Sequence, residues 1–245
     1  MSTSTTDLRS QIQVPREERL IVALDVADPA EARALVETLG DSVCFYKVGM
    51  ELFMAGGYFE LIDWLGEKGK KVFVDLKFFD VPETVRSAIR ALSKRNVAFA
   101  TIHGNQAIME AAGKEKGNLK VLAVTALTSL DRGDLDDLGF QCDVAQLVLS
   151  RARRALDAGC DGIISSGLEA PVIRKELGSR IMVVTPGIRP VENRVEDDQK
   201  RTVDVAQAFR NGADYIVMGR PIRGAADPKA AAEAVQASIA SVFPV

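Results

Sequence analysis

Eight short apolar runs alternate with helix-like stretches along this chain of 245 residues, and that order predicts an α/β protein folded as a single (β/α)8 TIM barrel. The apolar runs are rich in β-branched residues and lack polar alternation, which is typical of parallel strands covered on both faces. No linker or change in composition divides the chain, and one such barrel usually needs about 250 residues. We therefore expect one domain rather than two.

The expected strands are separated by stretches that carry helix signals. In chain order the strands span residues 20–25, 44–49, 71–77, 97–104, 120–127, 161–167, 181–187 and 214–220. The first helical stretch has Pro29 near its start and Gly40 at its end, the usual placement of these two residues. Residues 143–160 repeat apolar side chains at spacings of three and four, and residues 227–242 form the last helical stretch.

A doubly wound open sheet is the alternative architecture for the same order of elements. Such sheets usually carry a glycine-rich GxGxxG turn after their first strand. Here residues 25–28 read Asp-Val-Ala-Asp instead. The closed barrel is therefore the simpler prediction.

The chain ends and the composition indicate where this protein works. Residues 1–19 are polar and rich in Ser and Thr, so we expect a poorly ordered extension ahead of a catalytic barrel over residues 20–245. No apolar run reaches the roughly 18 residues that a membrane span requires, and the N-terminus lacks the apolar segment of a secretory signal. The three cysteines form no CxxC pair, which fits a reducing compartment. We expect a cytoplasmic protein that does not bind a membrane.

Charge and metal-ligand spacing exclude two further classes. The formal net charge is −3 and no basic block occurs, which argues against a nucleic-acid surface. No cluster of His and Cys has the spacing of a transition-metal site, so no metal is expected. Small anionic ligands remain open, because local charges decide such sites.

Ionisable residues gather at the expected strand ends, where barrels of this class hold their active sites. The first strand ends in Asp25, the second carries Lys47, and the third carries Asp75 and Lys77 with Asp80 just beyond. Side chains alternate along a strand, so Asp75 and Lys77 should share the face that points into the barrel. A structural ion pair with a helix-capping Asp80 is the plain alternative. Four or five charges in one mouth favour a catalytic site, because apolar packing can replace a purely structural buried pair.

Turns that contain glycine and arginine end the last two expected strands. Residues 185–190 read Thr-Pro-Gly-Ile-Arg-Pro, and residues 219–221 read Gly-Arg-Pro. Barrels of this class commonly hold a phosphate there, where Arg189 and Arg220 add fixed charge. The polar segment 189–201 between the turns would make a lid. Two ordinary turns with surface arginines are the alternative.

Three other polar positions carry weaker signals. Thr128 and Ser129 follow the fifth expected strand, where they either bind polar edges of a ligand or cap the next segment. His103 is the single histidine and ends the fourth strand. A hydrogen-bonded structural role is its favoured interpretation.

Residues 75–84, Asp-Leu-Lys-Phe-Phe-Asp-Val-Pro-Glu-Thr, resemble the DxKxxD signature of the orotidine 5′-monophosphate decarboxylase family. The resemblance runs from about Leu20 to the C-terminus. Further matching motifs follow in order at residues 22–25, 46–49, 127–129, 185–190 and 217–221. Glu83 stands where some bacterial members have Asn, a departure that leaves the charged pattern intact.

The resemblance implies a homodimeric enzyme that converts orotidine 5′-monophosphate to UMP and CO2 in de novo pyrimidine biosynthesis, without a cofactor. It implies that Lys77 protonates C6 of the pyrimidine, that Asp75 lies beside the leaving CO2, and that Asp80 comes from the neighbouring subunit. It also implies a set of substrate-binding residues, namely Asp25, Lys47, Thr84, Thr128, Ser129, Pro186, Arg189, Gln199, Gly219 and Arg220.

Two alternative functions share parts of this pattern. The Mg2+-dependent 3-keto-gulonate-6-phosphate decarboxylase and hexulose-phosphate synthase share the DxKxxD barrel, but they carry a metal-binding Glu where this chain has Lys47. A charged lysine cannot ligate Mg2+, so we expect no metal dependence. A non-catalytic barrel that binds phosphate ligands is the other alternative, and a turnover assay separates it from an enzyme.

Overall fold

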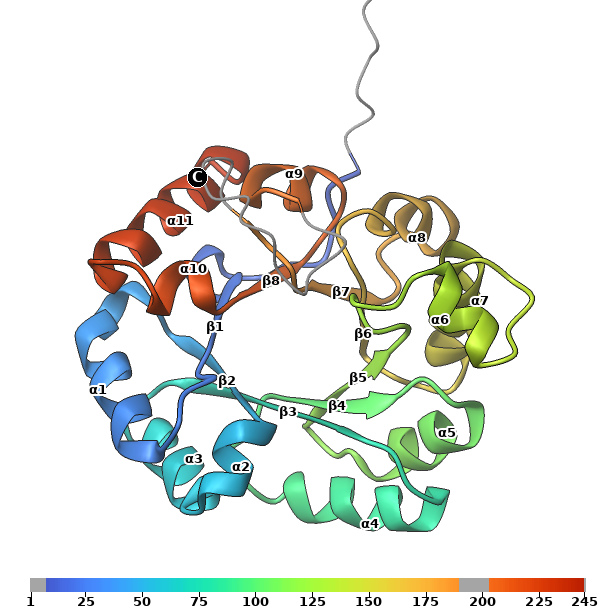
Figure 1. The fold of residues 1–245 in the computed structure, drawn as a ribbon, viewed down its shortest axis with the longest axis horizontal. Coiled ribbons are helices and arrows are strands. Elements are labelled where there is room, and N and C mark those ends of the chain that lie inside the picture. Colours follow the sequence, from blue (N-terminus) through green and yellow to red (C-terminus); the bar gives the residue numbers. More distant parts are fainter. Residues whose placement is uncertain (1–7, 190–202, 245) are drawn as a thin grey trace, which may run out of the picture.

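The computed structural model describes residues 8–189 and 203–244, and these fold into a closed barrel of eight parallel strands in the order β1 to β8 (Figure 1). The strands are β1 Leu20–Ala23, β2 Phe45–Gly49, β3 Lys71–Phe78, β4 Phe99–His103, β5 Lys120–Val124, β6 Gly162–Ile164, β7 Met182–Thr185 and β8 Tyr215–Met218. Pairing of Leu20 with Ile216 closes the ring between β1 and β8. The predicted (β/α)8 TIM barrel is confirmed, and the open sheet is excluded.

Helices surround the barrel on its outer side, as Figure 1 shows. They are α1 Pro29–Leu39, α2 Met50–Ala55, α3 Tyr58–Glu67, α4 Pro82–Leu92, α5 Gln106–Glu115, α6 Arg132–Asp137, α7 Val144–Asp157, α8 Ala170–Leu177, α9 Val205–Arg210, α10 Arg220–Arg223 and α11 Pro228–Val242. Short 3-10 turns are η1 Arg16–Glu18 and η2 Gly40–Ser42. Within the described parts of the chain, no helix has the length and apolar character to cross a membrane.

Local sequence explains where the helices begin. The carboxylate of Asp28 accepts the N–H groups of Ala30 and Glu31, and Pro29 takes the first helical position of α1. Asp143 caps α7 through a reciprocal capping box with Gln146. These caps satisfy N–H groups that the helix itself leaves without partners.

Apolar residues fill two separate layers. The larger layer lies between the strands and the helices, and it includes Val72 and Val74 of β3. The smaller layer fills the barrel interior, where Phe73 of the same strand meets the ring of Phe99 edge to face. The alternation predicted for β3 is thereby confirmed, and the interior apolar layer lies beneath the charged residues at the carboxyl-terminal mouth.

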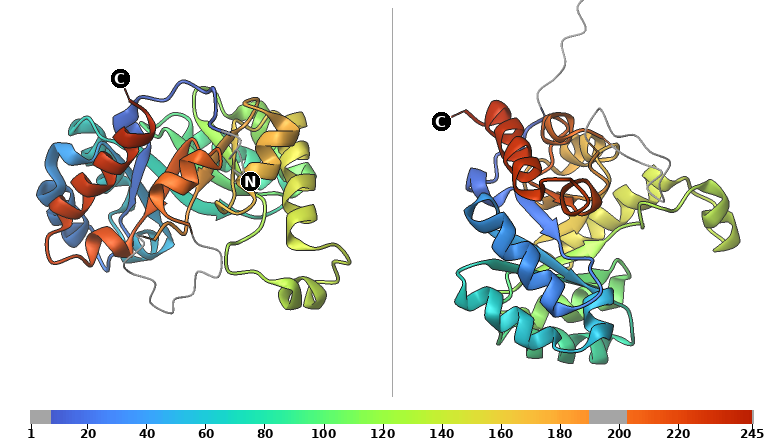
Figure 2. Two further views of the ribbon diagram at one scale, coloured as in Figure 1. Left: turned by 90° about the horizontal axis from the view of Figure 1, so that it is seen from above. Right: turned by 60° about the vertical axis from the view of Figure 1, so that its left-hand side comes forward.

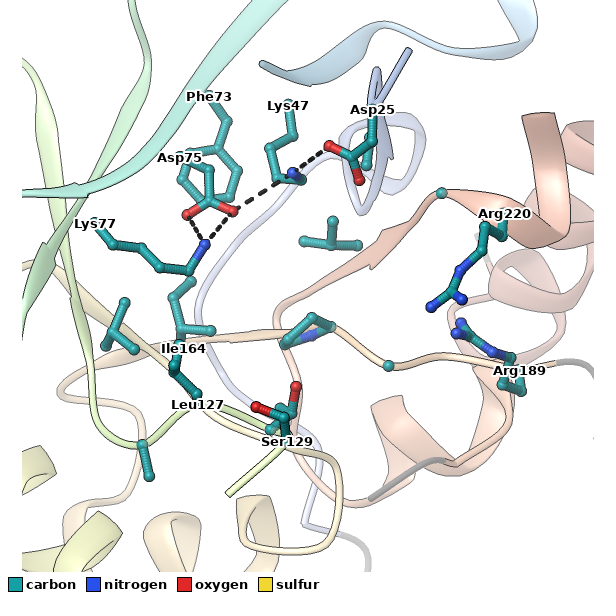
Figure 3. A pocket seen from close by; sticks show the side chains of 18 of the residues that line it. Asp25, Lys47, Phe73, Asp75, Lys77, Leu127, Ser129, Ile164, Arg189 and Arg220 are labelled. Atoms are coloured by element: carbon teal, nitrogen blue, oxygen red, sulfur yellow. Dashed lines mark hydrogen bonds and ion pairs between the residues drawn. The ribbon is translucent and has the colours of Figure 1, made fainter. Parts of the chain in front are cut away.

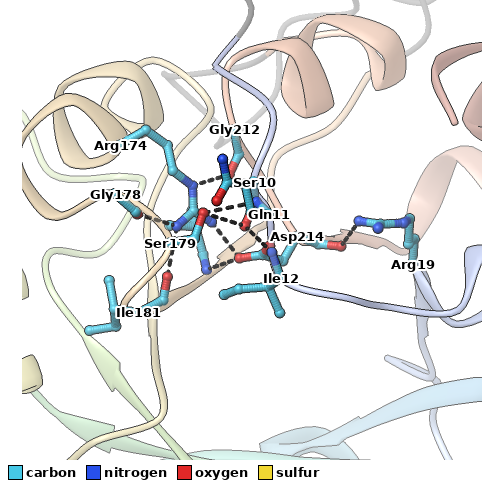
Figure 4. A network of polar contacts seen from close by, with 11 residues as sticks. Ser10, Gln11, Ile12, Arg19, Arg174, Gly178, Ser179, Ile181, Gly212 and Asp214 are labelled. Carbon is cyan, nitrogen blue, oxygen red and sulfur yellow. Dashed lines mark hydrogen bonds and ion pairs between the residues drawn. The ribbon is translucent and has the colours of Figure 1, made fainter.

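Residues 8–19 lie against the amino-terminal end of the barrel, which Figure 2 shows from two further directions. Ile12 and Val14 pack against the interior apolar cluster. The Gln11 N–H donates to Ser179 Oγ at 2.8 Å (Figure 4). Beneath them, a buried ion pair joins Arg174 to Asp214. Residues 8–19 thus cover the amino-terminal end of the barrel interior, a role that their polar sequence did not indicate.

Candidate active site

A cavity of about 290 Å3 opens at the carboxyl ends of the strands (Figure 3). Barrels of this class place their active sites at this end, because loops from all strands converge there. Ten of the residues predicted from the sequence line it, namely Asp25, Lys47, Asp75, Lys77, Thr128, Ser129, Pro186, Arg189, Gly219 and Arg220. Residues that lie up to 195 positions apart in the chain (Asp25 to Arg220) therefore meet in one cavity.

Four charged side chains form a row along one wall of the cavity (Figure 3). Lys47 Nζ lies 2.9 Å from Asp25 Oδ1 and 3.5 Å from Asp75 Oδ2. Lys77 Nζ lies 2.9 Å from Asp75 Oδ1 and 3.0 Å from Asp75 Oδ2. The signs alternate along the row, so each half-buried or buried charge has an oppositely charged neighbour.

The two central groups of the row, Lys47 and Asp75, stay ionised although they are largely withdrawn from water. Burial by itself would lower the pKa of Lys47, but the carboxylates of Asp75 and Asp25 outweigh burial and raise that pKa. Burial by itself would raise the pKa of Asp75, but Lys47 and Lys77 outweigh it and lower that pKa, helped by hydrogen bonds from Lys77 and Thr101. Asp75 is therefore an anion and Lys47 a cation at neutral pH.

Two arginines lie at the other end of the cavity. Arg189 follows β7 and Arg220 follows β8, and Figure 3 shows their guanidinium groups converging away from Lys77. Gly187 has φ of 73°, a left-handed conformation that favours glycine, so the turn before Arg189 depends on that residue. The cavity thus has an ionic row with a lysine at one end and a cationic pocket suited to a phosphate at the other.

Two predicted residues do not line this cavity. Asp80 is exposed in the loop after β3, where its Oδ1 accepts the N–H of Val81 at 2.6 Å. Thr84 is exposed in the first turn of α4. Within a single chain, neither residue contributes to the wall of the site. Gln199 lies outside the described residues.

His103 has the structural surroundings expected for it. Its Nδ1 lies 2.9 Å from Asn105 Oδ1, and its ring lies against the Phe79 ring with centroids 4.6 Å apart. It is not among the residues that line the cavity. His103 therefore supports the loop that carries Asp80 rather than the charged row.

Several residues of the site were not named as site residues from the sequence, among them Phe73, Arg223 and Thr101. Phe73 lines the floor of the cavity, and Arg223 lies one helical turn beyond Arg220 on the same cavity. Thr101 is buried in β4, and its hydroxyl contacts Asp75. Strand alternation could have indicated Phe73 and Thr101 as residues that face the barrel interior. Phe73 is two residues before Asp75, and Thr101 is two residues before His103 at the end of β4. Helical spacing of three carries the signal for Arg223.

Comparison with known proteins agrees with this geometry. The sequence model of a family described as "Orotidine 5'-phosphate decarboxylase / HUMPS family" matches residues 18–235. The chain belongs to this family. Because the family description gives two names, the names of individual relatives show which of the two groups this chain is more similar to.

Several relatives are similar to the chain over nearly its whole length. An orotidine 5'-phosphate decarboxylase of Methylococcus capsulatus is 69% identical over 94% of this chain and 95% of its own. One of Stenotrophomonas maltophilia is 52% identical over 96% of this chain and 98% of its own. The crystal structure of orotidine 5'-phosphate decarboxylase from Lactobacillus acidophilus superposes with a TM-score of 0.81 at 35% identity, covering 91% of this chain and 99% of that one.

Proposed function

We propose that the protein catalyses the cofactor-free decarboxylation of orotidine 5′-monophosphate to UMP and CO2 in the cytoplasm, as a step of de novo pyrimidine biosynthesis. The observation that carries this proposal is the distribution of charge in the cavity. The row from Asp25 to Lys77 stands at one end and the arginine pocket at the other. A nucleoside monophosphate has the matching layout, with a reactive base at one end and a dianionic phosphate at the other.

Lys77 supplies the chemistry in this proposal. When the bond between C6 and the carboxylate breaks, its electron pair stays on C6 and CO2 leaves. The ammonium of Lys77, held 2.9 Å and 3.0 Å from the two Asp75 oxygens, stabilises that negative charge and then gives a proton to C6. The neutral amine left on Lys77 regains a proton from solvent before the next turnover.

Repulsion between Asp75 and the substrate carboxylate is too weak to be the main term. Two unit charges about 4 Å apart interact by about 4 kcal/mol at an effective dielectric near 20. Large enzymatic accelerations correspond to roughly 8–23 kcal/mol. Stabilisation of the transition state must therefore supply most of the acceleration, and binding energy from the remote phosphate contributes to it.

The remaining residues of the cavity divide by their place along it. We assign Asp25 and Lys47 to the ribose hydroxyls and the charged row, and Thr128 with Ser129 to polar edges of the pyrimidine. The phosphate is assigned to the far end, where its proposed contacts are Pro186, Arg189, Gly219 and Arg220. Gln199, which lies outside the described residues, is proposed as a further contact. Glycine and backbone N–H groups there allow close approach to the phosphate oxygens.

The active site is proposed to be shared between two subunits of a homodimer. Asp80 is exposed and stands outside the cavity of its own chain, so a partner can receive it. The same loop exposes Phe79 at 66% and Val81 at 63%, and α2 after the neighbouring strand exposes Met54 at 77%. These large exposed apolar side chains follow the carboxyl ends of the neighbouring strands β2 and β3, and exposed apolar surface is typical of protein interfaces. A second copy would cover them, and it would bring Asp80 and Thr84 to the partner's site.

A turnover assay tests the proposed function directly. Purified protein is incubated with orotidine 5′-monophosphate, and formation of UMP and CO2 is measured. Conversion at enzymatic rates supports the proposal. Tight binding of UMP without turnover of orotidine 5′-monophosphate would instead identify a non-catalytic barrel that binds phosphate ligands.

A further inference from the structure

Strand β3 bulges at the segment that carries its charged residues. Val74 pairs with Ala100 and Phe78 pairs with Ile102, so a step of four residues on β3 is matched by a step of two on β4. A bulge withdraws backbone groups from the regular ladder and redirects side chains, and bulges are common beside active sites. Asp75 and Lys77 both lie inside this one.

Lys77 has a left-handed backbone conformation within the bulge. Its φ is 48°, and it is the single non-glycine residue with a positive φ in residues 8–189 and 203–244. A residue with a Cβ atom is unfavourable in this conformation and persists there only when its surroundings hold it. The amide of Lys77 donates to a side chain, the hydroxyl of Thr101, at 2.9 Å.

The hydroxyl of Thr101 joins the backbone of this segment to its carboxylate. Oγ1 accepts the N–H of Lys77 and donates to Asp75 Oδ1, each at 2.9 Å. Since a hydroxyl has one hydrogen, its donation goes to the carboxylate and its lone pair to the amide. Thr101 is completely buried in β4 and β-branched, so packing fixes the direction of the hydroxyl.

We propose that Thr101 is a positioning residue that holds Lys77 and Asp75 in the geometry required for decarboxylation. The inference rests on the proposed function. The Thr101 hydroxyl holds the backbone of Lys77 through the Lys77 amide. It also orients the Asp75 carboxylate, which accepts the hydrogen bonds of Lys77 Nζ. Electrostatic stabilisation depends on such preorganisation, because a misplaced charge stabilises the transition state less. Thr101 is not among the residues that line the cavity, so it acts through its two partners rather than on the substrate.

The test compares two substitutions that differ in the hydroxyl. Thr101→Val removes it and keeps the shape, whereas Thr101→Ser keeps it. We expect Thr101→Val to lower kcat for orotidine 5′-monophosphate roughly 10- to 100-fold, because a hydrogen bond to a charged group is lost. The KM of this variant should change less than about threefold, and Thr101→Ser should retain kcat within about threefold of wild type.

Thr125→Val is the matched control. Thr125 is also completely buried, and its hydroxyl donates to the carbonyl of Ile164 at 2.8 Å without contacting the charged row. This variant should retain kcat close to wild type. A large fall in its kcat would overturn the inference, since loss of any buried hydroxyl would then have the same effect.

Other outcomes also decide against the inference. They are a kcat of Thr101→Val within about twofold of wild type, an equal loss in Thr101→Ser, or a loss confined to KM. If Thr101→Val does not fold, the pair Thr101→Ala and Thr101→Ser decides in the same way, because alanine fits the space of threonine. A wild-type protein that fails to turn over orotidine 5′-monophosphate refutes the proposed function instead, so the two failures are distinguishable.

Discussion

Replacing Asp75 by Asn tests whether the charged row is held together by its central carboxylate. The Asp75 side chain is 12% exposed and lies between two ammonium groups, 2.9 Å from Lys77 Nζ and 3.5 Å from Lys47 Nζ. Asparagine keeps the shape of the side chain and removes its charge. The two lysines would then face each other across a neutral group, with Asp25 as the remaining carboxylate of the row.

The expected loss of stability follows from these distances. Each contact contributes about 5 kcal/mol of Coulomb energy at an effective dielectric near 20, before the cost of desolvation is subtracted. Removing one partner of a buried ion pair typically costs about 3–5 kcal/mol. We therefore expect Asp75→Asn to lower the free energy of unfolding by about 3–5 kcal/mol at pH 7. Turnover of orotidine 5′-monophosphate should fall steeply in the same variant.

The pH dependence of this loss has a definite sign. Folding lowers the pKa of Asp75, so its contribution is fully present above the pKa of an unfolded Asp, about 4, and disappears as pH falls through the lower folded value. The difference in stability between wild type and Asp75→Asn should therefore be full at pH 7. It should narrow progressively below about pH 4 and vanish once the pH falls below the folded pKa of the wild-type carboxyl.

Urea denaturation at one fixed protein concentration measures the difference. Asp63→Asn is the matched control, because Asp63 forms an exposed ion pair with Arg95 at 3.4 Å and its side chain is 58% exposed. That substitution should change the free energy of unfolding by less than about 1 kcal/mol. If Asp75→Asn also stays within about 1 kcal/mol of wild type at pH 7, the row does not depend on this carboxylate and the argument fails.

Four further predictions concern catalysis. Lys77→Ala should keep the fold and bind UMP but abolish decarboxylation, as turnover and UMP titration would show; near-normal turnover would remove Lys77 from its role. Activity should survive exhaustive chelation, because Lys47 replaces the carboxylate that a metal would need; a loss with EDTA that Mg2+ restores would instead indicate the metal-dependent alternative. Orotidine without its phosphate should react far more slowly, and added phosphite should partly rescue it, if Arg189 and Arg220 convert phosphate binding into a lower barrier; a change in KM alone contradicts this. Mixing inactive Lys77→Ala and Asp80→Ala subunits should restore about a quarter of the sites, since random exchange makes about half of the dimers mixed and each mixed dimer has one intact site; a mixture that stays inactive after verified exchange argues against sharing.

The pattern of residue types within each segment was sufficient to predict all eight strands of the barrel. The apolar, β-branched composition of the strands reflects burial on both faces, and every strand of the barrel lies within a predicted run or extends past it by one residue, as β3 does at Phe78. Several runs were predicted too long. Residues 161–167 contain only β6 at Gly162–Ile164, because Ser166 accepts the N–H of Leu168 and turns the chain before α8.

Ten residues that line the cavity were predictable from the sequence because they lie in the carboxyl-terminal part of a strand or in the loop that follows it. Period-two alternation is a local property, so it placed Asp75 and Lys77 on the interior face without knowledge of the partners of β3. Topology then brings all strand ends to one mouth, which accounts for the predicted residues that line the cavity. Residue type and position along the strand were sufficient for this part.

Only the tertiary structure decided which of these residues contact one another. Lys47 reaches Asp75 because β2 and β3 pair with Gly49 opposite Asp75, and that register depends on how the whole barrel closes. The register shift between β3 and β4 likewise belongs to the tertiary structure, and it produces the bulge that contains Lys77 with its positive φ. The same pairing of strands places the hydroxyl of Thr101 between the amide of Lys77 and the carboxylate of Asp75. The sequence alone specified which charged residues enter the barrel mouth, because the face of a strand on which a side chain lies follows from local alternation. The ion pairs among these residues, and the Thr101 hydroxyl that supports them, depend on contacts between different strands of the closed barrel.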